Sequence, residues 1–501
     1  MPTLLEVHAP RHQRRKPEET VLYRSIAEHL ATFLARIDAD PDRRGLPGHV
    51  RREFDRYLSC GILAAGFCRV YCESCRTSTV VAFSCKARAV CPSCTGRRMA
   101  EVGAHLVDHV LPDVPIRQWV LSLPHKVRFL CARDPKLCRE VRGVFIRAVQ
   151  SFYARRARDE GVPLGRCGAV VYTQRFDSAL RLDVHFHALV LDGVYTGFGV
   201  GDSLVFHEAS RLQDGEIESL VQHIAALLGG HLHRRGVLDE EGQLDPGAGE
   251  DLDTLGTCHA ASIQGLIPFG EKRGQRMTLW GEADEIPLPP PRSKKKLCAD
   301  HHGYSLHAGV RVAACSSRRE RLARYVARGP IAKDRLSVNR QGDIVYRFRR
   351  RWRNGKQAVV MDPMTFLSRL AALIPPPRSH VLSYHGVLGA AAARRDEIVP
   401  EPPRPESERV PHPCQAGKPK KARSTRKRQR RARIPWATLL ERVYLIDVLR
   451  CDCGGRRRVL AMVRDPSSIE RVLTHLGLPT GFPPRGPPRA VAGSLPLAHA
   501  R

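Results

Sequence analysis

Residues 169–191 read AVVYTQRFDSALRLDVHFHALVL, and this stretch decides the fold. Two runs rich in β-branched and aromatic residues, 169–174 and 182–191, flank a short polar loop. Such runs predict two strands that pair as an antiparallel hairpin. We expect this hairpin to form the centre of a larger antiparallel sheet.

His185 and His187 lie two residues apart in the second run, so a strand puts both imidazoles on one face and Phe186 on the other. If the loop turns near residues 179–180, Gln174 lies opposite one of the two histidines and shares their face. A His/His/Gln cluster with open positions suits a divalent ion that also holds a phosphate oxygen. By itself the H-x-H pattern is weak, because most such pairs are ordinary packed or surface histidines.

Apolar periodicity and turn residues predict the remaining elements. Helices are expected at 18–38, 49–58, 135–160, 217–235, 317–328, 365–374, 437–449 and 467–476, and further strands at 118–123, 343–348 and 356–361. Two interruptions, 239–257 and 285–296, are expected as surface loops, and 391–433 as a linker rich in Pro, Arg and Lys. Antiparallel strands mixed with long helices indicate an α+β fold.

The region 60–99 is dense in cysteine and turn residues. Its two C-x2-C pairs, Cys72 with Cys75 and Cys91 with Cys94, have the spacing of a structural zinc site with four thiolates and no place for water. Three more cysteines lie nearby, and we expect them to pack in the core, although one of them replacing a predicted ligand is the alternative. These three are Cys60, Cys68 and Cys85.

The chain has 501 residues and a formal net charge of +31. This excess indicates a polyanionic partner, and nucleic acid is favoured over an anionic membrane surface because Lys and Arg neutralise phosphates. No apolar stretch reaches the roughly 18 residues of a membrane helix, so a spanning protein is excluded. The N-terminus lacks the apolar core of a secretory signal, so we expect a cytoplasmic location and free thiols.

Several segments, in the same order along the chain, resemble the IS91-type rolling-circle transposases. They are the cysteine region with Cys60-Gly61, Ser84-Cys85-Lys86, Cys91-Pro92-Ser93-Cys94 and Arg97-Arg98-Met99, then QWVLSLP at 118–124, QRFDSAL at 174–180, HFH at 185–187, LDGVY at 191–195, SLHAGV at 305–310 and YHGV at 384–387. The resemblance extends from about residue 20 to 390. It implies a zinc-ribbon-like module followed by an HUH endonuclease domain, in which two histidines flank an apolar residue.

The resemblance also implies a tyrosine nucleophile and a metal ion. Tyr325 matches the family's Leu-Ala-Arg-Tyr segment, and Arg321, Arg324 and Arg328 lie within one helical turn of it, where they would bind DNA phosphates. Some relatives carry a second tyrosine at the position of Arg321, so a single nucleophile is favoured here. Tyr304 and Tyr384 are the reserve candidates.

The implied chemistry is cleavage and rejoining of single-stranded DNA at transposon ends and target sites through a 5′-phosphotyrosine. His185, His187 and Gln174 are the expected ligands of Mg2+ or Mn2+, and the zinc is expected to be structural. The alternatives are a plasmid replication initiator or relaxase with the same chemistry, and a non-catalytic zinc-dependent DNA-binding protein.

This interpretation divides the chain into five parts. They are a helical N-terminal arm (1–59), a zinc-binding module (60–105), the HUH domain (106–390), a basic Pro-rich linker (391–435) and a small C-terminal region with a disordered tail (436–501). In the last part Cys451-Asp452-Cys453 resembles a zinc knuckle, with Cys414 or His475 as a further ligand. A plain turn is the favoured interpretation, because no second cysteine pair follows.

Overall fold

The computed structural model describes residues 15–40, 44–238, 253–281, 296–314, 316–352, 354–400, 447 and 449–489. Its centre is a six-stranded sheet in the order β14-β4-β5-β3-β10-β9, with every neighbouring pair antiparallel. The strands are β3 (Ile116–Ser122), β4 (Gly168–Phe176), β5 (Leu182–Leu191), β9 (Cys298–His301), β10 (Tyr304–Val312) and β14 (Leu382–Gly386). The predicted hairpin is β4–β5, and the α+β fold with a central antiparallel sheet flanked by helices is confirmed.

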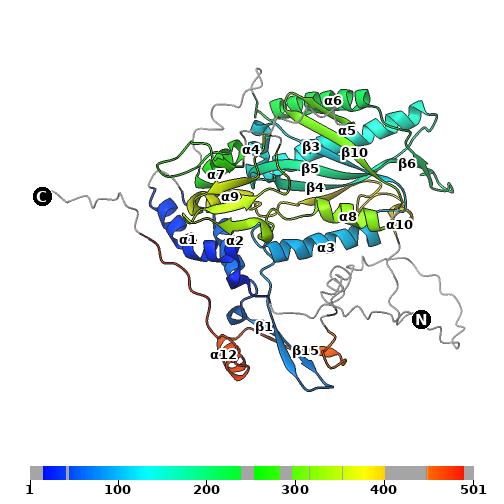
Figure 1. Ribbon diagram of the computed structural model, residues 1–501. Coiled ribbons are helices and arrows are strands. Elements are labelled where there is room, and N and C mark those ends of the chain that lie inside the picture. The colour runs from blue at the N-terminus through cyan, green and yellow to red at the C-terminus, as the bar shows by residue number, and fades with distance from the viewer. Residues whose placement is uncertain are drawn as a thin grey trace, which may run out of the picture.

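Helices cover both faces of this sheet (Figure 1). On one side lie α4 (His125–Arg133), α5 (Pro135–Asp159) and α6 (Asp214–Arg234), and on the other lie α3 (Pro92–His109) and α8 (Ser316–Val326). The alternation of β5 fixes which side chain meets which layer. Phe186 packs against Phe145 of α5, with ring centroids 6.2 Å apart, so the flanking histidines face the α3–α8 side.

Local capping explains where the longest helix begins. Asp134 accepts a hydrogen bond from the backbone N–H of Lys136 at 2.7 Å, and Pro135 occupies the first position of α5. Proline suits that position because its missing N–H would have no partner within the helix.

A buried polar network ties β3, α5 and β10 together at the end of β5. Asp192, which is fully buried, accepts two hydrogen bonds from Arg117 at 2.8 and 2.9 Å. It also accepts one from the Tyr153 hydroxyl at 2.7 Å and one from Arg311 at 2.7 Å. These bonds satisfy the carboxylate that burial would otherwise penalise.

The N-terminal helices pack on the part of the chain that carries the central sheet. They are α1 (Val21–Asp38) and α2 (Gly48–Leu58), and α1 lies against α9 (Pro363–Leu373). A second sheet has the order β11-β12-β13-β8, with β8 (Thr278–Trp280), β11 (Leu336–Val338), β12 (Ile344–Arg347) and β13 (Ala358–Met361). The remaining short elements are η1 (Pro17–Glu19), η2 (Leu63–Ala65), β6 (Gly193–Thr196), β7 (Val205–Glu208), α7 (Thr254–Gln264), η4 (Lys333–Arg335) and α10 (Arg395–Ile398).

A third sheet joins the two ends of the chain. Its order is β15-β1-β2, with β1 (Phe67–Cys72), β2 (Ser78–Ala82) and β15 (Arg457–Val463), and α12 (Pro466–His475) packs beside it (Figure 1). Ile469 and Leu473 of α12 complete a small core with Leu63, Phe67 and Val80. The C-terminal region, predicted as a separate part of the chain, therefore forms one structural unit with the cysteine module.

Some element predictions are wrong. The cysteine region contains α3, which we did not predict although Pro92 marks its first turn, and α4 was also missed. Residues 254–257 belong to α7, because Asp253 caps that helix through Gly256 N–H at 2.7 Å. The predicted linker at 391–433 and helix at 437–449 lie largely outside the described residues, as does Cys414. The described part of the tail runs along α1, where Gly486 N–H donates to Ala27 at 3.0 Å.

None of the described helices is long and apolar enough to cross a bilayer.

Candidate active site and cysteine clusters

The strand register brings the predicted metal ligands together. Gln174 of β4 is the direct partner of His185, and Tyr172 is the partner of His187. Side chains that face each other in an antiparallel pair share a face of the sheet. Gln174 and both histidines are therefore neighbours on the α3–α8 side, and all three are buried.

The two imidazoles converge through their Nε2 atoms, which lie 3.1 Å apart. Burial lowers the pKa of both histidines, so both rings are neutral near pH 7. Neutral imidazoles offer a lone pair to a metal ion, whereas protonated ones do not. The pair is therefore suited to hold one cation between the rings.

Hydrogen bonds at the Nδ1 atoms orient the rings. His185 Nδ1 lies 2.9 Å from the backbone oxygen of Asp183, so it carries the proton and leaves Nε2 with the lone pair. His187 Nδ1 lies 2.6 Å from the amide nitrogen of Gln118. A half-turn of this amide exchanges its nitrogen and oxygen, and the oxygen would then accept the proton of Nδ1 and leave Nε2 of His187 for an ion. Sequence reasoning missed Gln118, although it lies in the QWVLSLP segment.

Gln174 has one engaged and one open atom. Its Nε2 donates to the backbone oxygen of Val326 at 2.8 Å, which ties β4 to the end of α8. Its Oε1 is buried and has no hydrogen-bond partner among the residues that the structure describes. An orphaned buried acceptor beside two neutral imidazoles fits a divalent cation, because an amide oxygen is a ligand that such ions accept.

Tyr325 lies next to the histidine pair. Its ring meets the ring of His187 edge-on, with centroids 5.9 Å apart and an interplanar angle of 88°. The side chain is 38% exposed, so the hydroxyl-bearing ring is accessible to a substrate. Residues about 140 positions apart in the sequence are thus brought together by the packing of α8 against the sheet.

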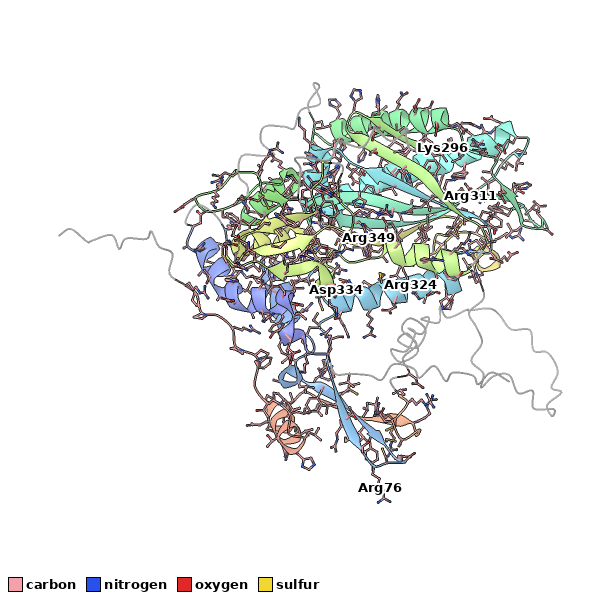
Figure 2. All side chains as sticks on the ribbon, in the orientation of Figure 1. Arg76, Lys296, Arg311, Arg324, Asp334 and Arg349 are labelled. Carbon is pink, nitrogen blue, oxygen red and sulfur yellow. The ribbon has the colours of Figure 1, made fainter. Side chains whose placement is uncertain are left out.

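The three arginines around Tyr325 have different surroundings. Arg328 follows α8 and places its guanidinium 4.8 Å from the centroid of the Tyr325 ring, whereas Arg321 is exposed one turn earlier on the same helix face. Arg324 instead pairs with Glu320 at 2.6 Å and lies where α8 packs along α3 (Figure 2). There its Cγ would lie 2.6 Å from a Cβ added at Gly103. Arg324 thus contacts both helices in this structure, and its contact with DNA stays a prediction.

The reserve tyrosines lie elsewhere on the sheet. Tyr304 is buried at the start of β10, and burial raises its pKa to about 12. Tyr384 is on the edge strand β14 and pairs with Val170, four residues before Gln174. Neither tyrosine has a ring contact with the histidine pair among those that the structure records.

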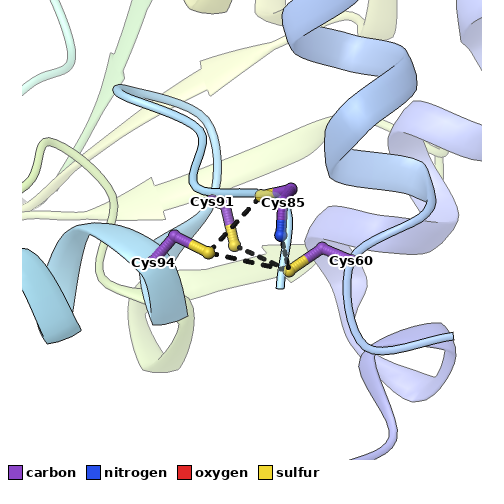
Figure 3. Close-up of side chains that lie close together, drawn as sticks. All are labelled: Cys60, Cys85, Cys91 and Cys94. Carbon is purple, nitrogen blue, oxygen red and sulfur yellow. Dashed lines mark hydrogen bonds between the residues drawn. The ribbon is translucent and has the colours of Figure 1, made fainter. Parts of the chain in front are cut away.

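The cysteines form two clusters, not one. The first cysteine cluster is Cys60, Cys85, Cys91 and Cys94 (Figure 3). The second cysteine cluster is Cys72, Cys75, Cys451 and Cys453. The predicted set of Cys72, Cys75, Cys91 and Cys94 is therefore wrong as a single site, because the two C-x2-C turns lie at opposite ends of the module and each meets other cysteines.

The sulfur positions fit tetrahedral zinc. A zinc–sulfur distance of about 2.3 Å gives sulfur–sulfur separations of about 3.8 Å in a tetrahedron. The first cluster has sulfur pairs at 3.4, 3.6 and 3.7 Å, and the second has two pairs at 3.6 Å. All these separations are far above the roughly 2.05 Å of a disulfide.

In each cluster the surroundings of at least one sulfur favour the thiolate. Arg15 donates to Cys60 Sγ at 3.2 Å, and the backbone N–H of Cys85 donates to the same sulfur at 3.3 Å. In the second cluster, a backbone hydrogen bond at Cys453 lowers the pKa of Cys451 to about 6. Because the thiolate is the form that binds metal, both clusters support structural zinc.

Models of two known protein families match two separate regions of the chain. A family model described as "Transposase zinc-binding domain" matches residues 26–123, which include the first cysteine cluster and two members of the second. A family model described as "Putative transposase" matches residues 168–396, which include the histidine pair, Gln174 and Tyr325. No curated protein and no solved structure matches the chain. Cys451 and Cys453 lie outside both matched regions.

Proposed function

We propose, from the premise that the chain is an IS91-type transposase, that it cleaves and rejoins single-stranded DNA at the ends of an insertion sequence. The matched transposase families support DNA as its partner and a nuclease or transferase reaction. The single observation that carries the finer proposal is the convergence of His185, His187 and Gln174 beside Tyr325. A cytoplasmic location remains part of this proposal.

His185, His187 and Gln174 would hold Mg2+ or Mn2+. Two neutral ring nitrogens and one orphaned amide oxygen provide three donors on one face and leave the remaining positions to water and substrate. A bound divalent ion supplies charge neutralisation at the scissile phosphate. Gln118 and the backbone of Asp183 orient the two rings through their Nδ1 atoms.

Tyr325 is the proposed nucleophile. Its Oη attacks the phosphorus in line and gives up its proton to water, and a new bond forms between Oη and phosphorus. The bond from phosphorus to the 3′ oxygen breaks, and that oxygen takes up a proton to become a free 3′-hydroxyl. The 5′-phosphotyrosine retains the phosphodiester linkage, so attack by another 3′-hydroxyl rejoins strands without a separate energy source.

Gln174 would fix the position of Tyr325 relative to the metal ion. The same side chain offers an oxygen to the ion and holds the end of α8 through Val326, the residue after Tyr325. Position errors of about 1 Å slow such reactions strongly, so a shared anchor for ligand and nucleophile is advantageous. Arg328, stacked on the Tyr325 ring, lies where its charge can attract the attacked phosphate.

The test is formation of a covalent protein–DNA adduct. The substrate is a set of labelled single-stranded oligonucleotides that tile the DNA flanking the coding sequence, incubated with Mn2+ and then denatured. We expect the parent protein to form an adduct, Tyr325→Phe to form none, and Tyr384→Phe to behave like the parent. Tyr325→Phe keeps the ring that contacts His187 and Arg328, so its folding and DNA binding should survive.

Peptide sequencing of the adduct identifies the nucleophile. A nucleotide on Tyr304 or Tyr384 would refute the assignment of Tyr325. Normal cleavage by His187→Ala in Mn2+ would show that the histidine pair is structural. A complete absence of adduct on every strand would favour the non-catalytic DNA-binding alternative.

A further inference from the structure

Two buried guanidinium groups lie on the opposite face of β4 from Gln174. Arg175 is on β4 itself and is 9% exposed, and Arg142 is on α5 and is 5% exposed. Among the described residues neither arginine forms an ion pair with a carboxylate, and the Nε atom of each is buried without a hydrogen-bond partner. Their remaining bonds are to neutral oxygens.

Those bonds satisfy only part of each guanidinium. Arg142 donates to the hydroxyl of Thr173 at 3.2 Å and to the backbone oxygen of His380 at 2.8 Å. Arg175 makes two long bonds to the backbone oxygens of Ala132 and Ala372, at 3.3 and 3.4 Å. Burial lowers the pKa of Arg175 to about 10 and also lowers that of Arg142. A buried charge without a counter-charge costs several kcal/mol, so an anion at this place would be stabilising.

The arginines line a cavity of about 310 Å³ between the start of α5 and the loop 375–381. Lys136, Arg139 and Arg378 also line it, whereas Asp134 is its one acidic lining residue. Asp134 is already engaged as the cap of α5. The cavity is therefore positively charged, and its size suits a small anion with a few water molecules.

Cys138 is the internal group that competes with an external anion. It lines the same cavity, and a hydrogen bond from Cys131 together with the two arginines lowers its pKa. A thiolate would neutralise one of the two buried charges and leave the other.

The cavity shares part of its lining with a second cavity beside the active site. A smaller cavity of about 50 Å³ is lined by Gln174 and Arg328, and also by Arg88 and Arg98 of the cysteine module. The two cavities share Thr173, Arg175 and the loop residues Pro375 and Val381. Arg175 therefore lines both the cavity around Arg142 and the smaller cavity that Arg328 lines.

We propose that the cavity around Arg142 and Arg175 binds a phosphate group, and that the group is a backbone phosphate of the DNA strand outside the scissile bond. Binding of phosphate rests on the buried arginines alone. The origin of the phosphate in DNA rests on the proposed function. Arginine suits this ligand because its planar fork donates two parallel hydrogen bonds to phosphate oxygens.

The first experiment titrates the full-length, zinc-loaded protein with inorganic phosphate against chloride at equal ionic strength, using calorimetry and thermal melting. We expect saturable binding by the parent and by Arg155→Met, an exposed position on the same helix, and at least a tenfold loss of affinity in Arg175→Met. Without phosphate, Arg175→Met should melt at or above the temperature of the parent, because methionine removes an uncompensated buried charge. No DNA is cleaved here, so the result is independent of the proposed chemistry.

Three outcomes would overturn the phosphate site. They are absence of saturable binding by the parent, equal affinity of Arg175→Met, and binding that appears only in Cys138→Ser, which would identify the Cys138 thiolate as the counter-ion.

The second experiment locates the phosphate in DNA. Oligonucleotides that carry one neutral methylphosphonate at successive positions are bound to the zinc-loaded parent and to zinc-loaded Arg175→Met, without added Mg2+ or Mn2+, so that no strand is cleaved. We expect one position outside the scissile bond at which the substitution weakens the parent by about tenfold and leaves Arg175→Met unchanged. If phosphate ions bind but no such position exists, the DNA origin is refuted and a free phosphate is the ligand.

Discussion

Replacing Cys453 by serine should release the C-terminal region from the cysteine module. Cys453 is exposed and contributes one of the four thiolates of the second cysteine cluster, so serine at this position disturbs little except metal binding. Cys68 of β1 belongs to neither cluster and provides the matched control. We expect two zinc ions per chain in the parent and in Cys68→Ser, and one in Cys453→Ser.

The size of the effect follows from what else holds the region in place. A structural zinc with four thiolates contributes about 10–16 kcal/mol to folding in small zinc domains. The two buried side chains of α12, Ile469 and Leu473, contribute together about 3–6 kcal/mol. Most side chains of β15 are exposed, so that strand adds backbone hydrogen bonds and little apolar burial. The metal therefore stabilises docking more than the apolar contacts do, and losing even about 4 kcal/mol of its contribution would weaken docking about 1,000-fold.

The assay separates docking from the covalent connection. A specific protease site is inserted between residues 401 and 446, the chain is cut there, and gel filtration shows whether the fragment containing β15 and α12 remains bound to the larger fragment. We expect the parent and Cys68→Ser fragments to stay together, and the Cys453→Ser fragments, or the parent fragments after chelation, to separate. Two zinc ions in Cys453→Ser, or fragments that stay together after chelation, would refute a metal-held docking.

Two further predictions concern the sheet. Gln174→Ala should slow adduct formation about 10–100-fold yet remain more active than His187→Ala, because water can replace the lost amide oxygen. The rate of adduct formation, measured for both variants at several Mn2+ concentrations, tests this order. A slower rate for Gln174→Ala than for His187→Ala would contradict it. Asp192→Asn should destabilise the protein by about 3–5 kcal/mol at pH 7, since Arg117 would remain buried and unpaired. Although burial by itself raises the pKa of Asp192, the hydrogen bonds from Arg117 lower it below the ordinary value, so the stabilisation is present above about pH 4 and is lost as the pH falls through the lowered pKa. Urea unfolding at pH 7 and pH 3 should therefore show a difference between parent and variant that shrinks at the lower pH, and a constant difference would be inconsistent with this account.

Local patterns predicted the hairpin and the face that carries the histidines. The reason is that a strand repeats every two residues and a short loop limits the register of its partner, so the sequence alone placed Gln174 opposite one of the two histidines. The structure shows that this histidine is His185. The side chain that orients His187 was missed, because Gln118 lies on β3 and reaches the site through a pairing that no local pattern specifies. Tyr325 was chosen by family resemblance, since its approach to His187 depends on long-range packing.

For the cysteines too, local sequence patterns could not predict which residues meet in the fold. A C-x2-C spacing specifies that two thiolates can reach one ion, but it does not specify which second pair completes the site. Cys91 and Cys94 meet Cys60 and Cys85, whose spacing has no recognisable pattern. Cys72 and Cys75 meet a pair from the far end of the chain, which the sequence suggested only as a weak knuckle.

The second cysteine cluster can form only late in translation, because two of its cysteines lie near the end of the chain. Cys60 and Cys94 are 34 residues apart, so at about 5–20 residues per second the ribosome completes the first cluster within roughly 2–7 s of starting it. Cys75 must wait for Cys451, 376 residues later, which takes roughly 20–75 s at the same rates. During that interval the nascent protein carries a half-built metal site, and a product of premature termination never completes it. Full metal loading therefore reports that translation has reached the last part of the message.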